Sequence, residues 1–336
     1  MIKIIADDNI PYLRGRLEDV AEVVYVDQFG FTPEIVKDAD ALLIRTRTRC
    51  NEKLLAGSAV KLVATATIGT DQIDTEWCES NGIMVRNSPG CNAPGVAQYV
   101  WSALLRSGFD KNRHKLGIVG CGNVGGIVYD WGRKLGVEIM VSDPPKERLG
   151  CTGIPYTPLH RLLRECDAVT LHTPLTKSGD DATFHLIGER ELAIMKPGAI
   201  LVNSARGPVV DFHALKEALR RDSIRAIIDT WEGEPETDSE ILDKVIYGTF
   251  HIAGYTRQGK QRATRMIIEA VEERFGIKGD TSHLEGVYKA PECISAEEIM
   301  NSYDPAEDFE ALRKNPAAFD TLRKNYNYRE EVTHGN

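Results

Sequence analysis

Short runs of aliphatic and β-branched residues alternate along the chain with longer stretches whose apolar residues recur at helical spacing. The short runs predict buried strands, and the longer stretches predict amphipathic helices. The first series of predicted strands lies at 3–6, 41–45, 62–65 and 83–86. The second series lies at 116–120, 138–143, 168–172, 199–203, 226–229 and 249–252. Strands that alternate with helices in this way are typical of α/β proteins, in which helices cover both faces of a parallel sheet.

Two such series predict two doubly wound, Rossmann-like domains, in keeping with a length of 336 residues. The turn-rich segment 87–92 separates the two series. A helix is predicted at 258–275, where no strand of the second series remains for it to accompany, so we expect it to return to the first domain. The predicted organisation is a discontinuous first domain at 1–92 and 254–276, a second domain at 93–253, and a short C-terminal appendage at 277–336.

The composition argues against several classes of function. The chain is 27% charged with a net charge of −9 and has no basic stripe, so we expect no nucleic-acid partner. No apolar run reaches the roughly 20 residues that a membrane span needs, and the N-terminus predicts a strand rather than a signal peptide. The seven cysteines form no C-x-x-C pair, which argues against a metal site and for a reducing, cytoplasmic location.

A glycine loop follows the predicted strand at 116–120 and opens a helix. In such a loop the first glycine makes the tight turn, the second lets the backbone approach a pyrophosphate, and the third permits close helix packing. The helix N-terminus also attracts the anion. The residues concerned are Gly120, Gly122, Asn123, Val124 and Gly125. A loop of this kind between a strand and a helix predicts a dinucleotide site.

An acidic residue, Asp143, ends the next predicted strand, at about the 20-residue distance expected for a ribose contact. A carboxylate at this place binds the adenosine ribose 2′-hydroxyl and repels a 2′-phosphate. We therefore expect NAD rather than NADP as the cofactor.

Three further segments stand at predicted strand ends, where ligands bind in open α/β sheets. They are 203–207, 229–235 and 251–256. Oxidation of a 2-hydroxy acid requires a base for the hydroxyl proton, and we assign that role to His251, with Glu234 as the carboxylate that orients it. Arg206 is the candidate clamp for the substrate carboxylate, because a guanidinium binds a carboxylate through two hydrogen bonds. Each residue alone also suits a structural position, but the combination behind a dinucleotide loop favours catalysis.

At these three segments the sequence resembles the D-isomer-specific 2-hydroxyacid dehydrogenases, and the resemblance extends over about residues 1–275. It implies an NAD-dependent enzyme whose first domain binds substrate and whose second domain binds NAD. The implied catalytic residues are Arg206, Glu234 and His251. The residues implied to contact NAD, besides the glycine loop, are Asp143, Thr173, Ser204, Ala205, Arg206, Asp229 and Gly254. Those implied to contact the substrate are Thr46, Thr67 and Tyr255.

Several motifs resemble one branch of this family more closely. They lie at 65–71, 89–93, 143–145, 251–256 and 319–326. The resemblance implies oxidation of 4-phospho-D-erythronate to 3-hydroxy-2-oxo-4-phosphobutanoate, in the biosynthesis of pyridoxal 5′-phosphate. It also implies a homodimer, with 277–336 as a shortened dimerisation region. Gln98 departs from the pattern, because the family usually carries glutamate at that position.

A small phosphorylated 2-hydroxy acid would also require positive charge for its phosphate. Arg45, Arg47 and Arg49 alternate at the end of a predicted strand, so their side chains share one face. Arg45 is the candidate substrate contact, because it directly precedes Thr46. Arg47 and Arg49 fit a solvated basic edge equally well.

Two other functions remain open from the sequence. Another D-2-hydroxyacid dehydrogenase, of the 3-phosphoglycerate or hydroxypyruvate type, would use the same three catalytic residues with a different substrate pocket. A protein of another class, a non-catalytic NAD-sensing binding protein, would use the same fold without turnover.

Overall fold

The computed structural model describes residues 1–150 and 153–332 and contains two compact units. The first unit comprises 1–92 and 256–289, and the second comprises 93–150, 153–255 and 290–332. Each unit is built on one parallel sheet, which confirms the predicted α/β class. Residues 277–289, which the sequence assigned to the appendage, pack instead with the first unit, where Leu284 joins its core.

The first unit contains a five-stranded sheet of order β2-β1-β3-β4-β5. Its strands are β1 (Ile2–Asp7), β2 (Ala21–Val26), β3 (Ala41–Ile44), β4 (Leu62–Thr65) and β5 (Met84–Arg86). The edge strand β2 is missing from the sequence prediction. It pairs with β1 in parallel over its whole length, from Ala21 opposite Ile2 to Val26 opposite Asp7.

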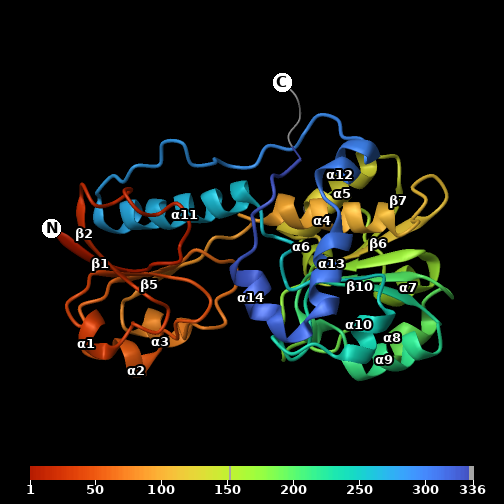
Figure 1. Cartoon of the computed structure of the whole chain (residues 1–336), viewed down its shortest axis with the longest axis horizontal. Coiled ribbons are helices and arrows are strands. Elements are labelled where there is room, and N and C mark those ends of the chain that lie inside the picture. Colours follow the sequence, from red (N-terminus) through yellow and green to blue (C-terminus); the bar gives the residue numbers. More distant parts are fainter. Residues whose placement is uncertain (151–152, 333–336) are drawn as a thin grey trace. The chain divides into compact units, whose positions relative to one another are not determined.

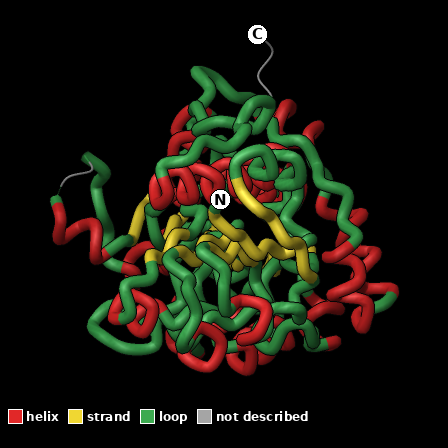
Figure 2. Tube along the Cα trace, turned by 90° about the vertical axis from the view of Figure 1, so that its left-hand side faces the viewer, coloured by secondary structure: helices red, strands yellow, loops and turns green. Residues whose placement is uncertain are grey.

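Helices cover both faces of this sheet, as Figures 1 and 2 show. The short helices α1 (Pro33–Val36), α2 (Glu52–Leu55) and α3 (Thr75–Ser80) lie on one face, and the long α11 (Arg257–Phe275) lies on the other. Successive strand residues alternate between these layers. Leu43 packs into the cluster of α11, whereas its neighbour Leu42 packs into that of α1 and α2. Helix α11 therefore packs on the sheet of the first unit, to which the sequence analysis expected it to return.

The second unit contains a six-stranded parallel sheet of order β11-β10-β9-β8-β6-β7. Its strands are β6 (Lys115–Val119), β7 (Glu138–Ser142), β8 (Ala168–Leu171), β9 (Ile200–Asn203), β10 (Arg225–Ile228) and β11 (Tyr247–Gly248). The prediction of a last strand at 249–252 is wrong, because β11 ends at Gly248. The chain beyond it forms a loop in which His251 has a φ of 59°.

The helices of the second unit pack around one large apolar core that includes the fully buried Trp101 and Trp131. The helices are α4 (Ala93–Arg106), α5 (Asn123–Lys134), α6 (Pro144–Leu149), α7 (Leu159–Glu165), α8 (Glu189–Ile194), α9 (Phe212–Arg220) and α10 (Ser239–Lys244). Helix α4 is buried from Ala93 to Leu104, and α5 packs directly against it, where Trp101 Nε1 donates to the Val128 carbonyl at 3.1 Å.

The C-terminal part of the second unit forms three short helices, α12 (Ala296–Ser302), α13 (Pro305–Lys314) and α14 (Phe319–Lys324). Its apolar residues are few, but Ile299, Leu312 and Phe319 are almost completely buried in the core of the second unit. The segment therefore belongs to the folded body of this unit.

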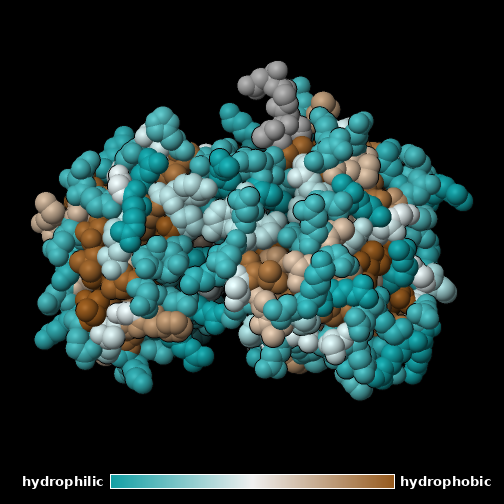
Figure 3. Space-filling model, viewed as in Figure 1, coloured by the Kyte–Doolittle hydropathy of each residue, from teal (hydrophilic) through white to brown (hydrophobic). Residues whose placement is uncertain are grey.

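The face shown in Figure 3 is mostly hydrophilic, with hydrophobic residues in separate patches. Among the described residues, no helix combines the length and the apolar character that crossing a membrane requires. Within the described residues, no group of three or more histidine, cysteine or acidic side chains is placed to hold a metal ion.

Candidate active site

The glycine loop lies at the carboxyl end of β6, between neighbours β7 and β8. The connections from β6 to β7 and from β7 to β8 place these two strands on opposite sides of β6, so the loop is at the switch point where dinucleotides bind. Gly120 has a φ of 85°, and a Cβ there would lie 2.8 Å from the His172 carbonyl oxygen. Gly122 caps α5, whose first turn contains Asn123 and Val124. The amides of a first helical turn have no partner within the helix and are available to an anion.

Gly125 is the position in this loop where a side chain fits worst. A Cβ there would lie 2.0 Å from the Gly120 carbonyl oxygen, so the substitution Gly125→Ala must push the turn and the helix apart. Overpacking of this kind costs roughly 1–3 kcal/mol, and we expect the Kd for NADH to rise about 5- to 150-fold. Fluorescence titration with NADH measures the change.

The matched control is Gly126→Ala in the same helix, where a Cβ meets no atom within 4 Å. This variant should bind NADH like the wild type, and it should unfold at an equal or higher temperature, since alanine is the better helix former. Equal NADH affinity in the two variants would contradict the close-packing role of Gly125.

Asp143 follows β7 and faces the glycine loop. Its Oδ2 accepts a hydrogen bond from the Cys121 amide at 2.7 Å, and its Oδ1 caps α6 by accepting from the Lys146 amide at 3.0 Å. The carboxylate is thereby fixed beside the loop. Each carboxylate oxygen has two lone pairs, so acceptor capacity remains for a ribose hydroxyl.

The next strand ends carry two buried hydroxyls that have no hydrogen-bond partner among the described residues. They are Thr173 Oγ1, after β8, and Ser204 Oγ, after β9. Buried polar atoms are almost always satisfied in native proteins. Their position along the same edge as the glycine loop indicates that a bound molecule supplies the missing partners.

The turn that carries Arg206 is fixed by Asn203 and by a close backbone contact. Asn203 accepts from the Ala205 amide at 3.2 Å and donates to the Arg206 carbonyl at 3.0 Å. At Gly207 a Cβ would lie 2.0 Å from the Trp231 carbonyl oxygen, so this turn packs against the loop after β10. The half-buried Arg206 side chain donates from Nη1 to the Ala205 carbonyl at 2.8 Å, which leaves its other N–H groups available.

Glu234 and His251 form the predicted pair. Glu234 Oε2 lies 2.8 Å from His251 Nδ1, and Glu234 Oε1 accepts from the Trp231 amide at 2.8 Å. Burial alone would raise the pKa of Glu234, but the charge and hydrogen bond of His251 hold it below its usual value. The group is therefore a carboxylate at neutral pH. Since a carboxylate only accepts, Nδ1 carries the proton and Nε2 is the basic nitrogen.

Asp229 holds the loop of His251, a role that its position in the sequence does not show. Its Oδ1 accepts from the Ile252 amide at 2.8 Å and from the Thr249 hydroxyl at 2.7 Å, and its Oδ2 accepts from the Ala253 amide at 3.0 Å. Tyr99 extends this buried hydrogen-bond network, because its hydroxyl lies 2.8 Å from that of Thr249. These contacts fix the chain on both sides of the left-handed His251.

A second support comes from Arg329, which the sequence prediction missed. Its guanidinium donates to the carbonyls of Gly95 at 3.0 Å and Ile252 at 2.9 Å, and also to that of Ala253. Its Nε donates to Gln98 at 3.2 Å. Gln98 is completely buried and also donates from Nε2 to the Glu330 carbonyl at 3.0 Å. A neutral amide can donate and accept at once, which a carboxylate cannot.

In the first unit, the predicted substrate contacts lie at the carboxyl edge of β3 and β4. Arg45 follows β3 and donates to the Asn9 carbonyl at 3.0 Å, at the switch point between β1 and β3. Thr46 is exposed beside it. Thr67 Oγ1 lies 2.7 Å from Thr65 Oγ1. Arg47 and Arg49 are exposed at the same strand end.

Comparison with known proteins bears on the identity of this site. The sequence profile for "D-isomer specific 2-hydroxyacid dehydrogenase, NAD binding domain" matches residues 92–253. The erythronate-4-phosphate dehydrogenase of Bacteroides fragilis is 46% identical over 98% of this chain and 97% of its own length. That of Escherichia coli O157:H7 is 40% identical over 98% of this chain and 92% of its own length. The chain belongs to the D-isomer-specific 2-hydroxyacid dehydrogenases. The predicted similarity to one branch of the family is confirmed by these relatives.

Solved structures of D-isomer-specific 2-hydroxyacid dehydrogenases and related enzymes share the fold. D-lactate dehydrogenase from Aquifex aeolicus, complexed with NAD and lactic acid, aligns with a TM-score of 0.66 and 25% identity over 83% of this chain and 99% of that one. NAD-bound 3-phosphoglycerate dehydrogenase of Entamoeba histolytica aligns with a TM-score of 0.68 and 27% identity over 82% and 96%.

As a D-isomer-specific 2-hydroxyacid dehydrogenase, the protein is an NAD-dependent oxidoreductase, which confirms the predicted enzyme class and cofactor. The structure fits this cofactor at two places. The glycine loop is open at Gly122, where a Cβ would meet no protein atom within 4 Å, and the unpartnered hydroxyls of Thr173 and Ser204 lie along the same sheet edge.

Proposed function

We propose that this enzyme oxidises 4-phospho-D-erythronate to 3-hydroxy-2-oxo-4-phosphobutanoate, a step in the biosynthesis of pyridoxal 5′-phosphate. The observation that carries the proposal is the near full-length similarity to erythronate-4-phosphate dehydrogenases, at 46% identity over 98% of the chain. The hydrogen-bonded Glu234–His251 pair supplies the acid–base chemistry that such a reaction requires.

In the proposed mechanism His251 is the base. Its Nδ1 proton is engaged by Glu234, so Nε2 takes the proton from the substrate C2 hydroxyl as the carbonyl forms. Glu234 fixes the tautomer and orientation of the ring, and it stabilises the imidazolium that results. In the reverse direction the same nitrogen returns the proton to the carbonyl oxygen.

Arg206 binds the substrate carboxylate in this proposal. Two parallel hydrogen bonds from its guanidinium orient C1 and C2, so that the hydroxyl faces the base. The turn of Asn203 and the close contact at Gly207 restrict the direction in which the side chain leaves the backbone.

We assign the cofactor contacts to residues along the carboxyl edge of the second sheet. They are Gly120, Gly122, Asn123, Val124, Gly125, Asp143, Thr173, Ser204, Ala205, Arg206, Asp229 and Gly254. When bound, NAD supplies the acceptor for the hydride that leaves C2. Asp229 also holds the loop of His251, through hydrogen bonds to both of its oxygens.

We assign the remaining substrate contacts to Arg45, Thr46, Thr67 and Tyr255. Arg45 is the candidate for the phosphate in the first unit. The proposal includes a homodimer, on the resemblance of 319–326 to a dimerisation region. It includes a reducing, cytoplasmic location, because the buried Cys50, Cys78, Cys121 and Cys166 are free thiols.

The test is a comparison of initial rates of NADH formation with 4-phospho-D-erythronate and with 3-phosphoglycerate. We expect kcat/KM to be at least about tenfold higher for 4-phospho-D-erythronate, because two substrates that differ by one buried contact commonly differ by this factor or more. A preference for 3-phosphoglycerate would instead support the alternative that the Entamoeba structure suggests. Tight NADH binding without turnover of any 2-hydroxy acid would support the NAD-sensing alternative.

A further inference from the structure

The C-terminal segment 319–331 lies against the loop that follows β11. The rings of Tyr326 and Tyr328 pack edge-on against Tyr255, with centroids 6.1 and 6.0 Å away. Arg329 donates to the carbonyls of Ile252 and Ala253 in the same loop. The segment thus contacts the loop that carries His251, although it is about seventy residues later in the chain.

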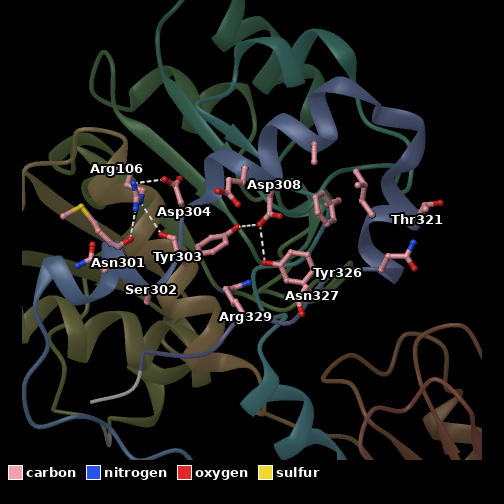
Figure 4. A pocket seen from close by; sticks show the side chains of 16 residues that line it. Arg106, Asn301, Ser302, Tyr303, Asp304, Asp308, Thr321, Tyr326, Asn327 and Arg329 are labelled. Carbon is pink, nitrogen blue, oxygen red and sulfur yellow. Dashed lines mark hydrogen bonds and ion pairs between the residues drawn. The ribbon is translucent and has the colours of Figure 1, made fainter. Parts of the chain in front are cut away.

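A partly buried polar network fixes the other side of this segment. A hollow of about 720 Å³ lies at this place. Among the residues that line it, Asp308 accepts hydrogen bonds from Tyr303 and Tyr326, at 2.7 and 3.3 Å (Figure 4). Arg329 lies beside them, with its guanidinium carbon 4.4 Å from the centre of the Tyr303 ring. Phe319 at the start of α14 is buried in the core. Helix α14 is therefore held in one place against the second unit.

Helix α14 carries Arg323 toward the catalytic loop. Its guanidinium carbon lies 5.6 Å from the centre of the Tyr255 ring. Its Nε is fully buried and has no hydrogen-bond partner among the described residues. Burial alone would lower the pKa of Arg323, but Tyr255, Glu234 and Asp229 raise it above its usual value. The side chain is thus a cation that the negative charges of Glu234 and Asp229 stabilise.

Glu234 and Asp229 attract this cation through their charge, but neither forms an ion pair with it. Both oxygens of Glu234 are engaged, by His251 and by the Trp231 amide. Both oxygens of Asp229 are engaged by the loop after β11. Within the described part of the chain, no carboxylate forms an ion pair with Arg323. The Arg323 side chain hydrogen-bonds that of Tyr255, but a phenol does not neutralise a partly buried cation whose Nε has no partner. The arrangement therefore favours an anionic ligand.

The position of Arg323 separates this ligand from the pyrophosphate of NAD. Glu234 and Asp229 follow β10, which is three strand spacings from β6 and its glycine loop in the order β10-β9-β8-β6. At about 4.8 Å per spacing, the two places are roughly 14 Å apart along the sheet edge. An anion at Arg323 therefore lies at the reacting end of the site.

We propose that Arg323 binds an anionic group of the substrate, its phosphate or its carboxylate, beside the Glu234–His251 pair. The proposal rests on the proposed function for the identity of that substrate. Arg323 is in this respect a specificity-determining residue that acts together with Arg206. Its planar guanidinium can hold two oxygens of either group at once, which a lysine cannot.

The test uses Arg323→Gln and Arg323→Lys, with Lys324→Gln as the matched control on the same helix, where Lys324 is exposed. Steady-state kinetics with 4-phospho-D-erythronate should show KM raised about 10- to 150-fold in Arg323→Gln, as expected for a lost charged hydrogen bond. We expect a smaller increase in Arg323→Lys and none in Lys324→Gln. The Kd for NADH should change less than about threefold, because the glycine loop is untouched, and kcat should change less than KM does.

Unphosphorylated D-erythronate distinguishes the two anionic groups. An effect confined to the phosphorylated acid identifies the phosphate as the group that Arg323 binds, and an equal effect on both acids identifies the carboxylate. An unchanged KM in Arg323→Gln, or a shifted pH–rate profile as the only change, would overturn the proposal. In that case Arg323 would act only through the charge of Glu234.

A binding experiment separates this proposal from the proposed function. Inorganic phosphate should raise the melting temperature of the NADH complex in wild type and in Lys324→Gln, and should do so much less in Arg323→Gln. This outcome would support the anion site even if the wild type fails to oxidise 4-phospho-D-erythronate. Equal stabilisation of all three proteins by phosphate would overturn it. If Arg323→Gln does not fold, Arg323→Lys gives the same comparison.

Discussion

Replacement of His251 by glutamine is expected to lower kcat by about 10²–10⁴-fold, the usual contribution of a positioned general base. In the wild type, His251 Nδ1 lies 2.8 Å from Glu234 Oε2. The glutamine amide can keep this hydrogen bond to Glu234, but it has no basic nitrogen. The Kd for NADH should change little, because the glycine loop and its strand are untouched. Single-turnover and steady-state rates of NADH formation measure the effect. The wild-type pH–rate profile has a limb that reports protonation of the base, and this limb should be absent in His251→Gln.

The chain offers a close control for this experiment. His185 also bonds a glutamate, with Nε2 2.7 Å from Glu232 Oε1, and its side chain is 32% exposed, against 29% for His251. His185→Gln should keep kcat within about threefold of wild type. Similar losses in the two variants would show that a histidine–glutamate pair on these loops serves the fold rather than the proton transfer.

The glycine loop and the catalytic strand ends could be predicted from the sequence because the evidence for them is local. A strand, a glycine turn and a helix follow one another within about twenty residues, and Asp143 stands at the expected distance from Gly120. In a parallel sheet, every strand end is brought to one edge by the topology itself. Arg206, Glu234 and His251 are therefore placed at one sheet edge by strand order alone.

The two differences in the strands have physical causes that a local pattern does not contain. The edge strand β2 is only partly buried, with Ala21 as its one buried residue, so it lacks the continuous apolar run of a central strand. The predicted strand at 249–252 has the right composition, but Asp229 binds the amides of Ile252 and Ala253. Those amides cannot then take part in a ladder, and His251 turns into the left-handed region.

The C-terminal residues of the site could not be found from the sequence for a different reason. Arg329 bonds the Ile252 carbonyl 77 positions earlier in the chain, and Arg323 meets Tyr255 across a similar separation. No spacing rule connects positions so far apart. The few apolar residues of this segment predicted an appendage, yet Ile299, Leu312 and Phe319 are buried in the core of the second unit.

Replacement of Arg206 by glutamine is expected to lower kcat/KM by about 10²–10⁴-fold. The substitution removes two charged hydrogen bonds, each worth about 1.5–3 kcal/mol. A free-energy loss of about 1.4 kcal/mol corresponds to a tenfold change in kcat/KM. Arg206→Lys keeps the charge but loses the planar fork, so we expect a smaller fall in kcat/KM. Because the turn is held through Asn203 and Gly207, both variants should fold and bind NADH normally. Initial rates over a range of substrate concentrations, with NADH titrations beside them, separate the effect on substrate from any effect on cofactor.

Arg225 provides the matched control for Arg206. It stands at the start of β10, on the amino edge of the same sheet, and donates to the Ser107 carbonyl at 2.9 Å. Ligands bind at the carboxyl edge of such sheets, so Arg225→Gln should leave kcat/KM within about threefold of wild type. If both arginines cost the same activity, the effect of Arg206 would be one of stability, and the carboxylate would have to be bound elsewhere. If only Arg206 matters, and added guanidinium ion partly restores the rate of Arg206→Gln, the missing group is the one that contacts the substrate.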